Sequence, residues 1–507
     1  MLGTQSVQNL PMLLGVYTQK EARERKLCST NVRFFFDTKP EATPRKDGEN
    51  PRVPKRRFRA PSSDSIEIRF TNNTLTQFGG DLLWDQFGGE IGLNQHFARH
   101  IRMDRGPLAF TAPELARFLT DAKILGAERL MHVETLRLDP VLSQLSGISS
   151  LPCGKTLGVY LKQHDENHLR GLDNMTLNLT HRLWKKRRQA LSKAERKEMD
   201  RVILDYDSST FTVYGKPAGA DRGRSFRKKE KPGFQPRFAF IGGLGLTIHQ
   251  ELLPQSHNLN KDFLPFHNET LKRLPKHAKP WAVRGDGGLL SQELVEHFEK
   301  QKLIYSISAQ MNAALRSAVG EIAESEWEEG ENGNREPYSI ARIEYKPKTW
   351  KKARTFIISR RLRPNPTGQQ FLIDAEKYKY FAYVTNYQGT AVEQFRFGVE
   401  RCTLEANIKE YKSDFNYDFL PCQELHANKA YVGYVALARN LSVFFRLWSA
   451  PLTVNRWTLG TFQARILRVC GNLKRSGKRW ILTLPTWWPY QTIMNDMIQR
   501  CGAQSPI

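Results

Sequence analysis

The sequence predicts an α/β protein in which a mixed β-sheet follows a helical region. Two observations predict this class. Helical periodicity runs from Thr74 to about Lys197, and the pattern then changes at Arg201 to apolar strands that alternate with helices. From Arg201 onward, three strands are followed by a helix, a strand, a helix and a strand. This order is typical of one mixed sheet with helices packed on its faces.

The composition indicates a polyanionic partner. The chain of 507 residues contains 77 Lys and Arg against 52 Asp and Glu, which gives a net charge of +25. Such an excess repels itself unless a polyanion supplies counter-charge, and nucleic acid releases condensed counterions when it is bound. A membrane surface would favour one basic amphipathic helix, whereas here the excess is spread along the chain. We therefore expect nucleic acid as the partner and no membrane.

Cysteine usage and hydropathy favour a cytoplasmic protein. The six cysteines are too far apart for a C-x-x-C metal knuckle and too few to staple this chain, so we predict reduced thiols. The apolar patch Leu10–Val16 lacks a small-residue cleavage site, and the most apolar helix, Tyr431–Trp448, contains Arg439 and Arg446. We expect neither segment to be a signal peptide or a membrane span.

Two segments precede the predicted sheet. Residues 1–60 end in the basic run Pro54–Arg59, which predicts a flexible arm that either grips phosphates or solubilises the chain. Residues 61–198 are predicted to be helical, and Thr111-Ala112-Pro113-Glu114 is a capping box that opens one of the helices. We expect this domain to bind specific DNA, for instance by a helix-turn-helix, or to brace the next domain. Its last helix carries the basic residues Lys185, Lys186, Arg187 and Arg188.

Two of the predicted strands end in acidic residues. Val202–Asp207 is an apolar strand whose alternation places Asp205 and Asp207 on the same face. The strand Trp281–Val283 leads Asp286 into a glycine turn. Taken singly, Asp205 could cap a neighbouring backbone and Asp286 could be a turn former. The remaining predicted elements of this region are strands within 237–248, a helix at 258–274, a helix at 291–300 and a strand at 303–308. Their order is that of an RNase H-like mixed sheet, which is the fold that we predict.

A β-rich insertion follows the last of these strands, because about a hundred residues are too many for a loop. Residues 324–336 are acidic and predict an exposed loop, whereas 338–345, 352–360 and 378–385 alternate like strands. We therefore predict an RNase H-like catalytic domain at 199–450, with the insertion at 309–395. Residues 451–507 are predicted to be a basic hairpin or tail around the turn Lys474–Arg479.

The helix after the insertion carries polar residues at helical spacing. Arg401, Glu405, Lys409 and Lys412 follow i, i+4, i+8 and i+11, so they stack on one face. A carboxylate fixed between cations suits work on metal and phosphate, and a solvated face of ion pairs is the alternative. The apolar stripe beside it, which would pack on the core, comprises Leu404, Ile408 and Tyr411.

Asp207, Asp286 and Glu405 fall at places that converge in an RNase H-like sheet. Like charges a few ångströms apart repel by roughly 1 kcal/mol in water and about 4 kcal/mol at an effective dielectric of ~20, so cations must neutralise such a cluster. Oxygen ligands without Cys or His suit Mg²⁺ or Mn²⁺ rather than zinc. Two such ions would serve a nuclease or strand-transfer reaction on a phosphodiester.

Three motifs stand in this order: Leu204-Asp205-Tyr206-Asp207-Ser208-Ser209, then Val283-Arg284-Gly285-Asp286, then Arg401-x₃-Glu405-x₆-Lys412. They resemble the catalytic domain of bacterial insertion-sequence transposases of the DDE type, in the branch with a Tyr-x₂-Arg-x₃-Glu-x₆-Lys signature. The resemblance covers roughly residues 75–450, and Gly398 stands at the position of the signature tyrosine. It implies an enzyme that recognises terminal inverted repeats, cleaves them with two metal ions, and joins the 3′ ends to target DNA.

The resemblance also implies roles for individual residues. Asp207, Asp286 and Glu405 become the metal-binding triad, with Arg401 and Lys412 as phosphate contacts beside it. Both Asp205 and Asp207 stay candidates for the first metal ligand, and we favour Asp207 because small hydroxyl residues follow it. The resemblance further implies a homodimer on double-stranded DNA and a place in the bacterial cytoplasm, at the nucleoid.

Two other functions are compatible with the motifs. Asp205-x-Asp207-x-Ser209 after an apolar strand also resembles the nucleophile motif of haloacid dehalogenase-like phosphatases, although no acidic pair follows the turn Gly285–Gly288. A catalytically inactive DNA-binding protein derived from a transposase would account for the charge and for Gly398. Metal-dependent cleavage of DNA distinguishes these possibilities.

Overall fold

The computed structural model describes residues 70–71, 73–104, 109–146, 150–223, 231–331, 336–363, 377–400, 402–454 and 457–501. The described residues from Thr74 onward belong to one structural unit. The basic arm predicted at 1–60 lies outside the described residues.

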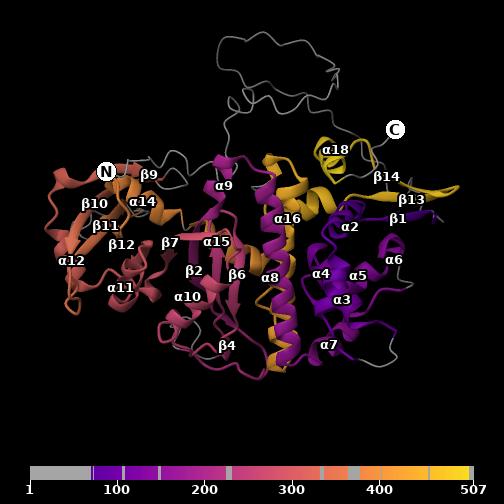
Figure 1. Cartoon of the computed structure of the whole chain (residues 1–507), viewed down its shortest axis with the longest axis horizontal. Coiled ribbons are helices and arrows are strands. Elements are labelled where there is room, and N and C mark those ends of the chain that lie inside the picture. Colours follow the sequence, from indigo (N-terminus) through magenta and orange to yellow (C-terminus); the bar gives the residue numbers. More distant parts are fainter. Residues whose placement is uncertain are drawn as a thin grey trace, which may run out of the picture. The chain divides into compact units, whose positions relative to one another are not determined.

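A helical region precedes the main sheet, as predicted (Figure 1). Thr111 and Glu114 form the predicted capping box, and Asp165 and Ser192 cap later helices in the same way. Each N-cap side chain accepts a backbone N–H that has no partner inside its helix. The elements are β1 (Thr74–Thr76), α2 (Asp81–Glu90), α3 (Leu93–His100), α4 (Ala112–Ile124), η3 (Leu130–His132), α5 (Val133–Arg137), α6 (Pro140–Ser146), α7 (Gly154–Lys162), α8 (Glu166–Gln189) and α9 (Lys193–Asp200).

Within the described residues, nine strands form one mixed sheet in the order β6-β5-β2-β7-β8-β12-β11-β10-β9. The strand β2 is parallel to β7 and antiparallel to β5, and β7 is parallel to β8. The first five positions therefore hold the third, second, first, fourth and fifth strands of the predicted RNase H-like order, which confirms the fold class. The elements are β2 (Arg201–Ser208), β3 (Phe211–Thr212), β4 (Gly233–Phe234), β5 (Arg237–Ile241), β6 (Leu246–Glu251), α10 (Phe263–Lys272), β7 (Lys279–Gly285), η4 (Gly287–Leu289), α11 (Gln292–Lys300) and β8 (Ile304–Ala309).

The β-rich insertion extends this sheet, because β12 pairs antiparallel with β8. The prediction of an exposed loop at 324–336 is wrong in part, since residues 328–331 form the edge strand β9, which pairs with β10. The guanidinium of Arg360 binds the Glu324 carboxylate and lies 4.0 Å from the ring centroid of Trp327, which fixes the acidic run on the sheet. The elements are α12 (Ala313–Gly320), η5 (Glu324–Glu326), β9 (Glu328–Glu331), β10 (Pro337–Tyr345), β11 (Arg354–Leu362) and β12 (Tyr378–Thr385).

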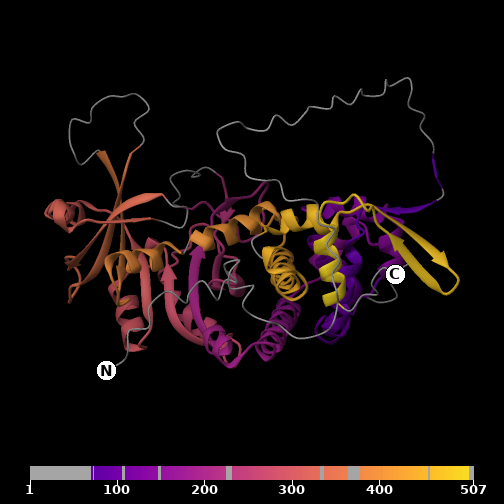
Figure 2. The same cartoon turned by 90° about the horizontal axis from the view of Figure 1, so that it is seen from above.

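Different helices cover the two faces of the sheet. Asp207 pairs with Phe238 across β2 and β5, so their side chains share a face. Tyr411 of α15 stacks on Phe238 with ring centroids 5.2 Å apart, which shows that α15 covers this face. Tyr206 points to the opposite face, where it contacts Phe263 of α10. Figure 2 shows α14 and α15, in orange, crossing the sheet. The helices are α14 (Ala391–Val399), α15 (Cys402–Ser413) and α16 (Leu425–Ser449).

The C-terminal segment contains the predicted hairpin, which is β13–β14, and a helix that was not predicted, α18. One hydrophobic cluster runs from Phe78 to Cys501, and the domain boundaries predicted at 198 and 450 stay predictions. None of the described helices is long and apolar enough to cross a membrane. The elements are η6 (Leu452–Val454), α17 (Leu459–Phe462), the π-helical η7 (Gln463–Leu467), β13 (Gly471–Ser476), β14 (Arg479–Thr483) and α18 (Gln491–Arg500).

Candidate active site

Asp207 and Asp286 line the same pocket. Asp205 on β2 is level with Arg284 on the parallel strand β7, and two further residues bring Asp207 level with Asp286. The pocket therefore lies at the carboxyl ends of two adjacent parallel strands. Phe263 of α10 contributes to its apolar wall.

Backbone N–H groups hold both carboxylates. Oδ1 of Asp207 accepts from the N–H of Ser208 at 2.7 Å, and Oδ1 of Asp286 accepts from the N–H of Gly288 at 3.1 Å. The second bond makes Asp286 the N-cap of η4, so it forms the turn and also lines the pocket. A backbone N–H thus helps to orient each carboxylate.

The pocket also contains Arg237, whose positive charge is already compensated. Its guanidinium donates to Glu251 at 2.7 Å and to Asp262 at 2.7 Å. Although burial opposes it, hydrogen bonding to Arg237 lowers the pKa of Asp262. Arg237 therefore ties β5 and β6 to the segment that precedes α10 and braces the pocket wall.

Asp205 forms a buried ion pair with Arg284. Nε and Nη2 of Arg284 donate to its two carboxylate oxygens at 2.7 and 2.9 Å, and the side chains are only 2% and 3% exposed. A Cβ at Gly242 would lie 2.6 Å from Oδ2 of Asp205, so the pair fits only because residue 242 is glycine. Both oxygens of Asp205 are thus bound to a guanidinium of the neighbouring strand.

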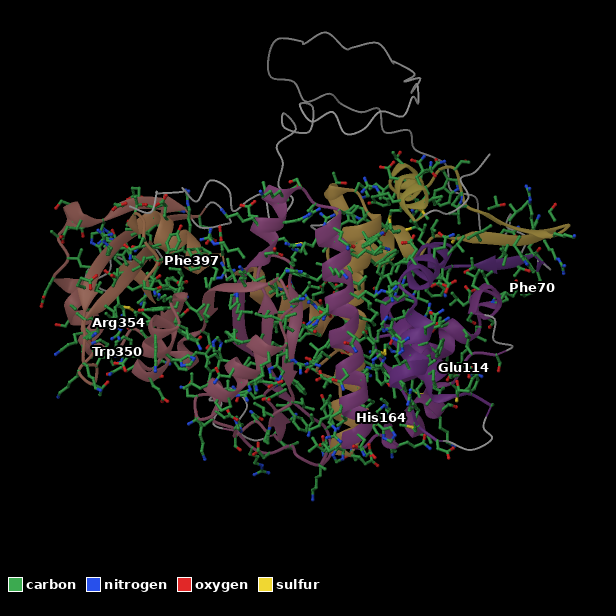
Figure 3. All side chains as sticks on the ribbon, in the orientation of Figure 1. Phe70, Glu114, His164, Trp350, Arg354 and Phe397 are labelled. Carbon is green, nitrogen blue, oxygen red and sulfur yellow. The ribbon has the colours of Figure 1, made fainter. Side chains whose placement is uncertain are left out.

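The same arginine reaches α14, the helix that precedes the one with the third predicted acid. Nη1 of Arg284 donates to the carbonyl of Phe397 at 3.1 Å and lies 3.6 Å from Glu400, at the end of α14. Phe397, labelled in Figure 3, packs between the sheet and Tyr387. The ring centroids of Phe397 and Tyr387 are 4.9 Å apart. Burial raises the pKa of Glu400, and Arg284 opposes the shift. Arg284, which belongs to β7, therefore links β2 to α14.

Glu405 belongs to α15, one turn after Arg401. Arg401 lies outside the described residues, and only the backbone of Glu405 is described. Later in the helix, the hydroxyls of Tyr411 and Thr247 are 2.7 Å apart, so α15 is fixed over β6. The backbone of Glu405 thus lies between a contact of α14 with β7 and a contact of α15 with β6, on the face that carries Asp207.

Glu410 anchors α15 to α16 from the core side. Its carboxylate lies 3.0 Å from Arg439 and 3.2 Å from Arg446, and it accepts the N–H of Leu459 at 2.9 Å. Although burial opposes it, the charges of Arg446 and Arg439 lower the pKa of Glu410. Neither the ion pairs of Glu410 nor that of Arg284 could be predicted from the sequence, because spacing along the chain carries no sign of them.

The cations predicted to bind DNA differ in their surroundings. Lys409 and Lys185 are exposed, whereas Lys412 and Arg187 are partly buried. Lys186 lies 3.8 Å from the ring centroid of Trp448 and 3.6 Å from Glu90. Both carboxylate oxygens of Asp200 accept from Nε of Arg188 at 2.9 Å. Lys186 and Arg188, two of the residues predicted to bind DNA, thus have counter-charges within the chain.

The donor chemistry of the pocket fits a hard divalent cation. Asp207 and Asp286 offer only oxygen, which suits Mg²⁺ or Mn²⁺. Within the described side chains, which exclude that of Glu405, no group of three His, Cys, Asp or Glu residues could hold a metal ion.

The strand order and the two strand-end acids define an RNase H-like α/β protein with a carboxylate pocket at the ends of its central parallel strands. The chain belongs to the family described as transposase DDE domain group 1, which matches residues 58–505. The resemblance to DDE transposases is thereby confirmed.

Solved structures similar to this chain include two transposases. The piggyBac transposase synaptic complex with hairpin DNA has 12% identity and a TM-score of 0.34, and the match covers 78% of this chain and 88% of that chain. The Mos1 transposase paired-end complex with the left transposon end has 12% identity and a TM-score of 0.16, and the match covers 41% of this chain and 60% of that chain. A search of curated proteins found no significant match.

Proposed function

We propose that this DDE transposase binds the terminal inverted repeats of a bacterial insertion sequence, cleaves DNA phosphodiesters there, and joins the 3′ ends to target DNA. The observation that carries the proposal is the pocket shared by Asp207 and Asp286 at the ends of β2 and β7. Family membership and the net charge of +25 support DNA as the substrate. The family assignment also replaces the phosphatase interpretation of Asp205-x-Asp207.

Asp207, Asp286 and Glu405 are the residues that would hold two Mg²⁺ or Mn²⁺ ions. The oxygen-only donors Asp207 and Asp286 and the course of α15 over the face that carries Asp207 support this assignment. When bound, the ions lower the pKa of a water or 3′-hydroxyl and stabilise the leaving oxygen.

The chain itself contributes orientation and charge. The N–H groups of Ser208 and Gly288 fix the carboxylates before substrate arrives. The exposed Lys409, on the helix of Glu405, would contact a phosphate. We assign the same role to Arg401 of the signature. We assign Lys412 and the α8 residues Lys185, Lys186, Arg187 and Arg188 to the same DNA surface. We expect two copies of the chain to act together on two DNA ends.

Cleavage of a supercoiled plasmid that carries both ends of the element tests the proposal, with Mg²⁺, Mn²⁺ or EDTA present. Wild type should cut only with metal. Asp207→Asn, Asp286→Asn and Glu405→Gln should each lower the rate by roughly 10²-fold or more, the scale on which electrostatic stabilisation of a transition state acts. Affinity for the DNA should change little, because none of these substitutions removes a cation.

Glu321→Gln is the matched control, since Glu321 is an exposed carboxylate at the end of α12. It should cut like wild type. Loss of DNA binding in the three site variants would mean that the acids are structural. Tight binding by wild type without any cutting would favour an inactive DNA-binding protein instead.

A further inference from the structure

The turn of the hairpin β13–β14 is strongly cationic. Residues 471–484 include Lys474, Arg475, Lys478 and Arg479 and no acidic residue. All four side chains are exposed. Among the described residues, no carboxylate lies within ion-pair distance of any of them, whereas Arg273 and Arg354 elsewhere are paired with Asp or Glu. Four uncompensated charges lie close together here, and nothing in the fold requires them.

The tip of this hairpin extends beyond its third strand. Residues 471–473 of β13 pair with β1, but β13 and β14 continue to pair with each other as far as Ser476 and Arg479. Residues 474–481, which we call the hairpin tip, are therefore a two-stranded ribbon beyond the end of β1 (Figure 2). A two-stranded ribbon gains little stability by itself, and like charges lower it further.

The hairpin tip carries cations on both of its faces. Arg475 is opposite Trp480, so these two share one face, and Lys474 shares the other with Ile481. The two apolar side chains are 57% and 50% exposed. Arg475 lies 6.0 Å from the ring centroid of Trp480. Each face thus combines a free positive charge with an exposed apolar group.

We propose that the hairpin tip is a DNA-binding arm that lies in the major groove of a duplex, an inference that rests on the proposed function. The major groove is about 12 Å wide and admits a two-stranded ribbon, whose strands are about 4.8 Å apart. A ribbon in a groove has phosphates on both sides, which matches cations on both faces. On the face that meets the floor of the groove, the exposed apolar side chain, Trp480 or Ile481, would contact base edges, including the methyl group of thymine.

A second copy of this chain is the rival occupant. The hairpin tip has no acidic residue, and the chain has a net charge of +25, so repulsion opposes this contact. DNA, in contrast, gains from it, because each phosphate that a cation neutralises releases counterions. Charge complementarity therefore favours the duplex.

The first test measures affinity for a labelled duplex of the element end between 50 and 200 mM salt. The variant changes Lys474, Arg475, Lys478 and Arg479 to Gln. The matched control changes Lys272, Lys276, Lys279 and Lys300 to Gln, four exposed lysines in or beside α10, β7 and α11. The hairpin variant should bind roughly tenfold or more weakly at the low-salt end, and its slope of log K against log[salt] should fall by about 2 to 4, at ~0.9 for each lost phosphate contact. The control should keep the wild-type slope.

The second test uses a photo-crosslinking residue, Lys478→p-benzoylphenylalanine, with Lys276→p-benzoylphenylalanine as its control. Position 478 should crosslink to the duplex and position 276 should not. If the hairpin variant kept the DNA affinity and salt slope of wild type, and position 478 gave no crosslink, the hairpin tip would not be a DNA-binding arm. Cleavage by wild type in the same preparation would still support the proposed function. A change in oligomeric mass, measured by light scattering, without a change in DNA affinity would assign the hairpin tip to a protein contact and overturn the arm as well. Absence of any DNA binding by wild type would end both proposals.

Discussion

At the scale of single residues, Asp205 and Asp207 lie two positions apart on β2, but the surroundings of the two carboxylates differ. Asp205 forms a bidentate, buried pair with Arg284, whereas Asp207 lies in the pocket and is partly exposed. Removing one partner of a buried ion pair costs roughly 3–5 kcal/mol, because the other charge is left without compensation. Asp205→Asn should therefore lower the free energy of unfolding by about that amount, as measured by urea denaturation. Asp207→Asn should leave it nearly unchanged while it abolishes cleavage.

The reverse result would exchange these roles. If Asp205→Asn kept full stability but stopped cleavage, Asp205 would act as a metal ligand. Arg284→Met provides the second arm of the experiment, since it should destabilise the protein as much as Asp205→Asn does. The double variant should then cost less than the sum of the two single changes, because the second substitution removes a charge already without its partner.

Asp205 and Asp207 also show how much of the site can be predicted from the sequence. Alternation and strand ends are local properties, so the sequence located Asp207 and Asp286 at strand ends that the structure shows to be adjacent. The partner of Asp205 is 79 residues away, and finding it requires the register of two parallel strands. That register is a tertiary property which no local pattern encodes. The sequence alone therefore leaves both Asp205 and Asp207 as candidate ligands.

At the scale of elements, α14 packs closely on β8 at Gly398. A Cβ at this position would lie 2.8 Å from Oγ of Ser306 and 3.3 Å from the ring of Tyr383. Gly398→Ala should thus lower the free energy of unfolding by roughly 1–3 kcal/mol, the cost of overpacking. Oγ of Ser306 is buried and has no hydrogen-bond partner among the described residues, so Ser306→Ala should cost little and should relieve the clash. A double-mutant cycle by urea denaturation measures this coupling, and strictly additive effects would contradict the packing argument.

The elements also show where local sequence patterns are sufficient to predict a strand. The strands predicted at 338–345, 352–360 and 378–385 match β10, β11 and β12 closely, because alternation and β-branched or aromatic residues mark them. The acidic run that forms β9 lacks these marks, and its strand conformation depends on pairing with β10 and on Arg360. The sequence therefore does not predict β9, whose stability comes from distant partners.

At the scale of the whole molecule, three buried histidines make stability depend on pH. His164 (labelled in Figure 3), His249 and His267 are 5%, 8% and 0% exposed. Burial lowers the pKa of these side chains to about 4, about 3 and about 4, from an ordinary value of 6.5. They are therefore neutral in the folded protein at pH values where the unfolded chain already binds protons.

Stability should consequently fall as the pH is lowered from about 6.5 towards 4, because the unfolded state binds the additional protons in that range. Each of the three histidines should cost on the order of 2 kcal/mol by pH 5. Their sum is comparable with the whole stability of an ordinary domain, so the urea midpoint should drop steeply between pH 7.5 and pH 5.0. His249→Gln removes one titrating group and should reduce this pH dependence by about a third, whereas His132→Gln, at an exposed position, should leave it unchanged. A midpoint that stayed constant over the range would show that these histidines become charged without unfolding the core.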